Sequence, residues 1–253
     1  MVPVREIGVA VCSAATLLAL VGFSSGASAY NESQAVTMLG APLTLVQSTT
    51  ALSPPTLRFH RDGRLHAAWI EKNGVQGEVK TAAISADHSA VAQVSVNPPG
   101  AGPEAVHQSP GFAIGVDGEQ FVTWSSANKT PGALFASDLR LARLDSGGAR
   151  VQPPVQVNDD GLAISHTFEH VIAGKNGEIY LAWLDGRNKD RSGAGIMFAC
   201  SQDHGATVGK NLVLDGMACP CCRPMLAQAP DGSLWVACRT TFAANVRDIV
   251  VAR

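Results

Sequence analysis

The chain has 253 residues, a formal net charge of −2 and charged side chains at only 16% of positions. A near-neutral charge without a basic run argues against a nucleic-acid-binding protein. Its 25 glycines and 14 prolines favour short strands joined by many loops.

Residues 1–29 are predicted to be a signal peptide. An apolar run from Ile7 to Val21 is followed by Ala27-Ser-Ala29, the small-x-small pattern that a signal peptidase cleaves. A membrane anchor is the alternative, but a spanning helix needs about 20 apolar residues. We therefore expect an extracytoplasmic protein, periplasmic or secreted, whose domain covers residues 30–253 without a further membrane span.

A short turn recurs four times along the rest of the chain. Its first residues are 55, 59 and 55 positions apart, in the pairs Asp62-Gly63, Asp117-Gly118, Asn176-Gly177 and Asp231-Gly232. The residue six positions after each glycine is, in turn, Trp69, Trp124, Trp183 and Cys238. Each turn lies between two strand-like segments, which predicts a β-hairpin whose two central residues both have positive φ.

Each hairpin is followed by a third strand and, in three copies, by a fourth. Repeated units of four short antiparallel strands predict an all-β β-propeller, with blades near residues 54–97, 109–158, 168–215 and 223–253. A sandwich or barrel would not require the same hairpin and tryptophan in each unit. Two arrangements stay open: a strand at Leu43–Val46 closes a four-bladed ring, or the four blades are part of a larger propeller, such as a six-bladed one.

The third unit carries an Asp-box motif between its third and fourth strands. Its residues are Ser201, Asp203, Gly205 and Thr207, in which the aspartate can accept hydrogen bonds from its own turn. With this motif and the run CPCCRP, the chain resembles the sialidase (neuraminidase) superfamily with bacterial-neuraminidase (BNR) repeats, and within it a cysteine-containing bacterial subgroup. The resemblance implies a propeller that cleaves terminal sialic acid. It also implies that the Asp box is structural and lies away from the active site.

The order of strands in a propeller blade places the loops before the first strand and after the second strand on one rim. The resemblance implies arginines on this rim that grip a carboxylate, together with an acidic group. The candidates for these catalytic roles are Asp185, Arg187, Arg223, Arg239, Arg247 and Glu169. The simpler interpretation is that these charges only brace their own loops.

Two features depart from the sialidase pattern. Ser53-Pro-Pro55 stands where the family has its first arginine motif, and neither Tyr30 nor Tyr180 suits the role of nucleophile. The sequence therefore favours a propeller that binds a glycan, such as an acidic sugar, or a protein partner. An exo-sialidase type of glycoside hydrolase is the alternative.

Five cysteines remain once Cys12 leaves with the signal peptide, and an odd number leaves at least one thiol unpaired by an intramolecular disulfide. One interpretation is structural disulfides. The candidate pairs are Cys219 with Cys222, or one cysteine of the run Cys219–Cys222 with Cys238 or Cys200, and a bridge between Cys200 and Cys238 would tie two blades together.

The cluster of Cys219, Cys221 and Cys222 also allows two other interpretations. No cofactor is required, but thiolates suit a soft metal such as copper or zinc. Zinc would require a fourth ligand, for which His166 or His170 is a candidate. A redox-active dithiol is the remaining possibility, because Cys219 and Cys222 have the spacing of such pairs.

Overall fold

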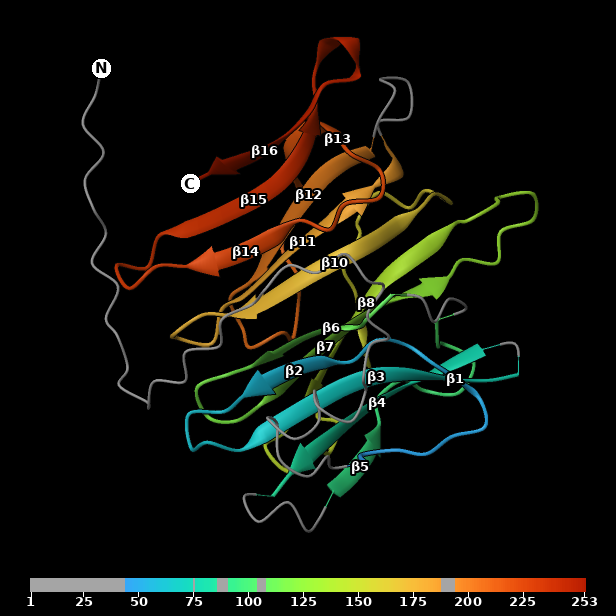
Figure 1. Ribbon diagram of the computed structural model, residues 1–253, viewed down its shortest axis with the longest axis vertical. Helices are drawn as coiled ribbons and strands as arrows, with labels where there is room; N and C mark the ends of the chain where they lie inside the picture. Colours follow the sequence, from blue (N-terminus) through green and yellow to red (C-terminus); the bar gives the residue numbers. More distant parts are fainter. Residues whose placement is uncertain (1–43, 75, 86–90, 104–107, 188–193) are drawn as a thin grey trace, which may run out of the picture. The chain divides into compact units, whose positions relative to one another are not determined.

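The computed structural model describes residues 44–74, 76–85, 91–103, 108–187 and 194–253, which are coloured in Figure 1. The predicted signal peptide, residues 1–29, lies outside these described residues. Within them the regular secondary structure is strand, apart from short 3-10 turns such as Ala243–Asn245, and loops and turns connect the strands. None of the helical structure in this part of the chain is long and apolar enough to span a membrane.

The strands form four antiparallel units, which confirms the predicted all-β propeller. The first unit contains β1 (Ala51–Leu52), β2 (Thr56–Phe59), β3 (Leu65–Asn73), β4 (Gln76–Ile84) and β5 (Val91–Ser95). The second contains β6 (Gly111–Ile114), β7 (Gln120–Ala127), β8 (Ser137–Leu144) and β9 (Val155–Gln156). The third contains β10 (His166–Ala173), β11 (Ile179–Asp185), β12 (Ala194–Ser201) and β13 (Leu212–Ala218). The fourth contains β14 (Met225–Gln228), β15 (Leu234–Thr241) and β16 (Arg247–Ala252), and it is joined to the third in one seven-stranded sheet where Ala218 of β13 pairs with Thr240 of β15.

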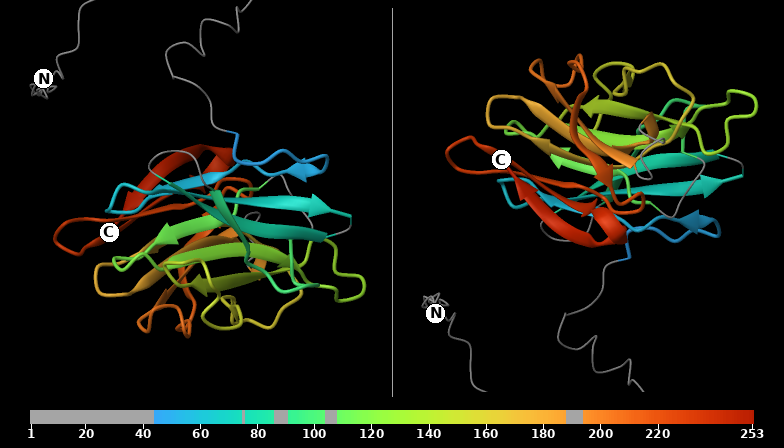
Figure 2. Two further views of the ribbon diagram at one scale, coloured as in Figure 1. Left: turned by 90° about the horizontal axis from the view of Figure 1, so that it is seen from below. Right: turned by 90° about the horizontal axis from the view of Figure 1, so that it is seen from above.

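The first strands of the units lie innermost and side by side. Strand β2 contacts β6, β6 contacts β10, and β10 contacts β14. Figure 1 shows these four strands following one another, and Figure 2 shows the same units from two further sides. The units therefore follow one another around a common axis, as in a propeller.

Each unit packs on the preceding one through the residue six positions after its turn glycine. Trp124 is buried between the first and second units, and Trp183 between the second and third. Cys238 takes the same place between the third and fourth units, where it contacts Leu184 and Ile196 among others. Side chains alternate between the faces of a strand, so the same position in each unit points to the same neighbour.

The four hairpin turns differ from the prediction. At the first of them, the N–H of Gly63 donates to the carbonyl of His60, and the N–H of His60 donates to the carbonyl of Arg64. Gly63 has a φ of 86°, but Asp62 is not among the residues with positive φ. These are three-residue loops that end in a left-handed glycine, so the prediction of two positive φ angles was wrong. The Asp62 carboxylate instead accepts the N–H of Arg64 at 2.9 Å and braces the turn.

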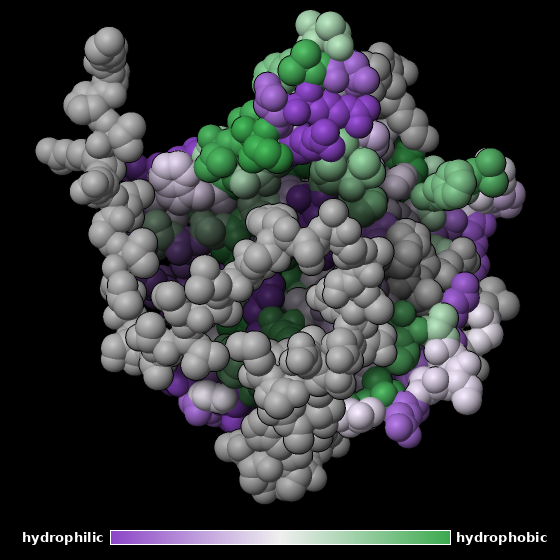
Figure 3. Space-filling view, in the orientation of Figure 1, coloured by the Kyte–Doolittle hydropathy of each residue, from purple (hydrophilic) through white to green (hydrophobic). Residues whose placement is uncertain are grey.

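The segment before the first unit does not close the ring in the described part of the chain. Leu45 and Val46 pack against Trp69 of the first unit, on the face that in each later unit packs on the preceding unit. Strand β16 pairs only with β15 there. On β16, Ile249 is 70% exposed, and hydrophobic surface is visible over this strand in Figure 3.

The Asp-box turn has the self-bonded geometry expected from its residues. The Asp203 carboxylate accepts hydrogen bonds from the Thr207 hydroxyl at 2.6 Å and from the Ser201 hydroxyl at 2.7 Å. The bonds from Thr207 are the main reason why the pKa of Asp203 falls to about 2. Next to it, His204 lies against the turn glycine Gly177, so these two turns share one rim, opposite the loops with the candidate charges.

Candidate functional site

The loop ends of the inner strands border two adjoining cavities. The larger has a volume of about 510 Å³ and is lined from β2, β10, β14 and the segment before β6. The smaller has a volume of about 310 Å³ and lies among the first three units. Gln108, Ser109 and Phe168 line both cavities. The cysteine loop stands at the same place, with Pro220 on the smaller cavity and Cys221 on the larger.

A β-bulge in β10 shapes the wall between the two cavities. The pairing of β10 with β11 shifts between Thr167 and His170, and Phe168 has a φ of 56°. A bulky aromatic residue rarely adopts this left-handed conformation. Its N–H donates to the Gln108 side-chain carbonyl at 3.4 Å. Backbone strain of this kind concentrates at functional sites, and nothing in the strand-like segment HTFEH signalled it.

Two of the predicted site residues, Glu169 and Arg223, meet beside these cavities. Glu169 is 2% exposed and lines the smaller cavity. Burial raises the pKa of its carboxyl group, while the charge of Arg223 acts in the opposite direction. Arg223 lines the larger cavity and donates to the carbonyl of Ser109 at 2.9 Å.

Arg58 also lines the larger cavity, and the sequence analysis missed it. Its Nη1 donates to the carbonyl of Leu57 at 2.8 Å, and burial lowers the pKa of its guanidinium. Arg58 and Arg223 are the charged residues among those lining the larger cavity, and none of these lining residues carries a carboxylate. The predicted site residues were sought at the loop ends of the strands, whereas Arg58 lies within β2. Arg58 lies two residues after Thr56 on the inner strand β2, so both side chains share one face of the strand, and that spacing was the available signal.

The wall residue His170 makes a testable contribution to stability. Burial, followed by the charges of Arg58 and Arg223, lowers the pKa of His170 from 6.5 to about 4. Between these values the unfolded chain is protonated at His170 and the folded protein is not, so its stability falls as the pH decreases through this window. Urea unfolding across this pH range measures the effect.

The matched variant is His170→Asn, because an amide oxygen can still accept the hydrogen bond that Leu226 N–H donates to His170 Nδ1 at 3.0 Å. We expect a shallower loss of stability in this variant between pH 6.5 and about 4. Identical pH profiles for the two proteins would contradict the assignment.

Asp185 and Arg187 form a buried network instead of a ligand clamp. Asp185 is fully buried and accepts hydrogen bonds from Trp183 Nε1 at 3.0 Å and from Arg187 Nε at 2.9 Å. Arg187 Nε also lies 3.5 Å from a carboxylate oxygen of Asp160. His166, Asp160 and Asp185 have metal-ligand spacing, but the guanidinium already supplies the positive charge between the two carboxylates. These charges brace the loops that carry them.

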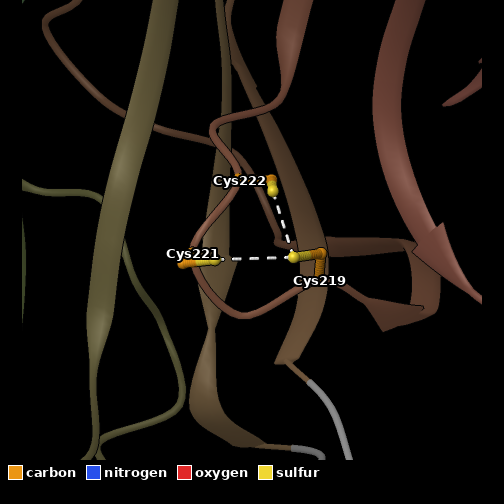
Figure 4. Close-up of side chains that lie close together, drawn as sticks. All are labelled: Cys219, Cys221 and Cys222. Atoms are coloured by element: carbon orange, nitrogen blue, oxygen red, sulfur yellow. Dashed lines mark hydrogen bonds between the residues drawn. The ribbon is translucent and has the colours of Figure 1, made fainter. Parts of the chain in front are cut away.

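Arg239 and Arg247 face thiols. Their Nη1 atoms lie 3.8 Å from the sulfurs of Cys222 and Cys219, respectively. The Cys219 sulfur is 3.0 Å from that of Cys222 and 3.6 Å from that of Cys221 (Figure 4). Burial raises the pKa of Cys219, but hydrogen bonds from Cys222 and Cys221 and the charge of Arg247 outweigh it and bring the pKa to about 7.

The predicted disulfides are absent, because all five cysteines in the described part of the chain are free thiols. Cys200 donates to the carbonyl of Ser201, whereas Cys238 lies against Asp215 and Thr240. The two therefore face different surroundings. The turn at Cys219–Cys222 holds its sulfurs 3.0 Å apart, well beyond the roughly 2.05 Å of a disulfide.

The six candidate residues thus separate into three groups. Asp185 and Arg187 belong to the buried network, and Glu169 and Arg223 lie at the axial cavities. Arg239 and Arg247 belong to the thiol cluster. The three-arginine clamp implied by the sialidase resemblance is therefore not assembled from these residues.

Neither models of known protein families nor the sequences of curated proteins give a significant match. Solved structures do. An α-L-arabinanase from Penicillium chrysogenum complexed with arabinobiose is 18% identical with a TM-score of 0.52, over 82% of this chain and 66% of that chain. An endo-arabinase from Bacteroides thetaiotaomicron is 12% identical with a TM-score of 0.48, over 78% and 72%. The polysaccharide lyase Uly1 is 17% identical with a TM-score of 0.48, over 80% and 49%.

At these identities, the likeness to the arabinanase shows the fold alone. The chain spans just under two thirds of that enzyme's length. The similar structures named above are not sialidases, so the comparisons support the sialidase resemblance only at the level of the β-propeller. The class of protein is therefore a β-propeller with a cationic axial cavity bordered by a thiol cluster.

Proposed function

We propose that the protein binds an anionic ligand of the acidic-sugar class in the larger axial cavity. The observation that carries this proposal is the charge of the cavity wall, where Arg58 and Arg223 stand with no carboxylate among the lining residues. A guanidinium group can hold a carboxylate through two parallel hydrogen bonds. The strands of the propeller thus bring together two positive charges that lie far apart in the sequence.

Both arginines are held in place before a ligand arrives. Each donates one N–H to a backbone carbonyl, Arg58 to Leu57 and Arg223 to Ser109. A guanidinium has five N–H donors, so this anchoring leaves donors for a ligand. Fixing the side chain in advance reduces the conformational entropy that binding would cost.

The adjoining smaller cavity suits the body of a sugar. Trp124, Phe135 and Phe168 provide aromatic surface, and Ser125, Ser137 and Gln108 provide hydrogen-bonding groups. Ligand sites typically combine an apolar wall with a few placed polar groups. The propeller of similar fold that was solved with arabinobiose also supports a carbohydrate as the ligand class.

In this proposal the protein binds the sugar but does not hydrolyse it. Most glycoside hydrolases use a pair of carboxyl groups across the scissile bond. Glu169, with its raised pKa, could act as an acid, but it is the one carboxylate among the residues lining the two cavities. We place this function outside the cytoplasm, in the periplasm or secreted, because residues 1–29 have the pattern of a signal peptide.

Calorimetric titration with D-glucuronate and its neutral counterpart D-glucose tests the proposal. We expect glucuronate to bind and glucose to bind much more weakly. Arg223→Ala and Arg58→Ala should each weaken glucuronate binding by about 10- to 100-fold, which corresponds to the loss of a charged hydrogen bond. Arg223→Lys should retain part of the affinity.

The control is Arg64→Ala, since Arg64 is an exposed arginine on the opposite rim that pairs with Asp62. It should bind glucuronate like the wild type. Equal affinity for glucuronate and glucose, or unchanged glucuronate binding in both axial variants, would refute the proposal. Turnover of a fluorogenic sialoside or arabinoside would refute its non-catalytic form.

A further inference from the structure

The loop between β13 and β14 brings three thiols to one point. The sulfurs of Cys219, Cys221 and Cys222 all lie within 4.8 Å of one another. In Figure 4 the side chains of Cys221 and Cys222 both point toward Cys219. The loop is held in this shape by backbone hydrogen bonds from Cys219 N–H to the carbonyl of Arg239 at 2.7 Å and from Cys222 N–H to the carbonyl of Cys219 at 3.3 Å.

Positive charge is built around this cluster. Arg239 and Arg247 approach the sulfurs of Cys222 and Cys219 from β15 and β16, at 3.8 Å each. Three thiolates with one monovalent cation would carry a charge of about −2, which two guanidinium groups can balance. This accounts for two arginines that the sugar-clamp interpretation leaves without a role.

We propose that Cys219, Cys221 and Cys222 bind one Cu(I) ion in a three-coordinate, all-sulfur site. Binding replaces the three S–H protons, which pass to solvent, and forms three Cu–S bonds without any change in oxidation state. Thiolates are soft ligands that favour Cu(I) and zinc over hard cations. The copper site borders the cavity proposed for the sugar, because Cys221 lines it, but its ligands do not include Arg58 or Arg223, so variants of the two sets of residues test the two proposals separately.

The ligand number favours Cu(I) over zinc. Zinc in structural sites takes four ligands in a tetrahedron. Among the described residues, no histidine or carboxylate completes the cluster. The two predicted fourth ligands are used elsewhere, since His166 contacts Asp160 and His170 accepts the N–H of Leu226.

The ion has a route to the site. Cys221 is exposed and lines the larger axial cavity, whereas Cys219 is buried. An ion entering from the cavity therefore meets one accessible thiol first and is then enclosed by the other two.

Titration of the reduced, full-length protein with Cu(I) in the absence of oxygen tests this proposal, with bathocuproine disulfonate as a coloured competitor. We expect one Cu(I) to be retained per chain, with an ultraviolet thiolate-to-copper charge-transfer band. Cys219→Ser should abolish retention against the competitor. Arg239→Ala and Arg247→Ala should each weaken binding by about 10- to 100-fold, as expected for residues that support metal ligands.

The matched control is Cys200→Ser, because Cys200 is a free thiol outside the cluster. It should retain one Cu(I). Three results would overturn the proposal: no Cu(I) retained by the wild type, unchanged retention in folded Cys219→Ser, or tighter retention of Zn(II) than of Cu(I). Circular dichroism of each variant confirms that it has folded.

Discussion

Replacing Asp185 by alanine is expected to destabilise the protein by about 3 to 5 kcal/mol, because it removes a fully buried carboxylate, leaves the buried N–H of Trp183 without an acceptor and takes from Arg187 its closest carboxylate partner. Asp185 is fully buried, and its two carboxylate oxygens accept hydrogen bonds from Arg187 and from Trp183. Urea unfolding, followed by circular dichroism, measures the loss.

Two companion variants make this prediction specific. Asp185→Asn keeps the size of the side chain and one acceptor oxygen, so it should cost less than alanine. Asp248→Ala, at an exposed acidic residue near the start of β16, should change the stability by no more than about 0.5 kcal/mol. A normal unfolding midpoint for Asp185→Ala together with lost glucuronate binding would show that Asp185 serves the ligand and not the fold.

Trp183→Ala is expected to cost a similar amount, about 3 to 5 kcal/mol, mainly because it opens a cavity between two blades. Trp183 is fully buried in the core shared by the second and third units, with Phe121, Leu141 and Met197 around it. Surrounding strands cannot collapse into the space without breaking the pairing within a blade. The measurement is again urea unfolding at fixed pH.

The control for Trp183 is Trp235→Ala, at a tryptophan that is 40% exposed on β15. Its loss should cost about 1 kcal/mol or less. Trp183→Phe separates packing from hydrogen bonding, since it keeps a ring in the core but removes the N–H that Asp185 accepts. Equal costs for Trp183→Ala and Trp235→Ala would contradict the inter-blade role.

The same network explains why loop charges were poor guides to a ligand site. Arg187 lies two residues from Asp185, and its guanidinium donates hydrogen bonds to the Asp185 carboxylate. Arg223 has no acidic residue so close in the sequence, and it lines the larger axial cavity. An arginine on one of these loops therefore says little about binding until its hydrogen-bond and ion-pair partners are known. The inward face of the first strand in each blade is the more informative place, as Arg58 shows.

The sequence by itself determined the propeller and its blades. The recurring turn, the strand-like flanks and the residue six positions later are local patterns, and alternation along a strand converts them directly into a face that packs on the neighbouring blade. Trp124, Trp183 and Cys238 accordingly occupy equivalent buried places. The sorting of loops between two rims followed from strand order alone.

Only the tertiary structure decided which polar groups meet. Arg58 and Arg223 are separated by most of the chain, and their shared cavity arises from the packing of inner strands from different blades. The bulge at Phe168 and the approach of Arg239 and Arg247 to the thiols likewise depend on contacts between segments that no local pattern relates. Periodicity encodes which face of a strand is buried, but the pairing of charges depends on positions in space, which packing sets to within an ångström.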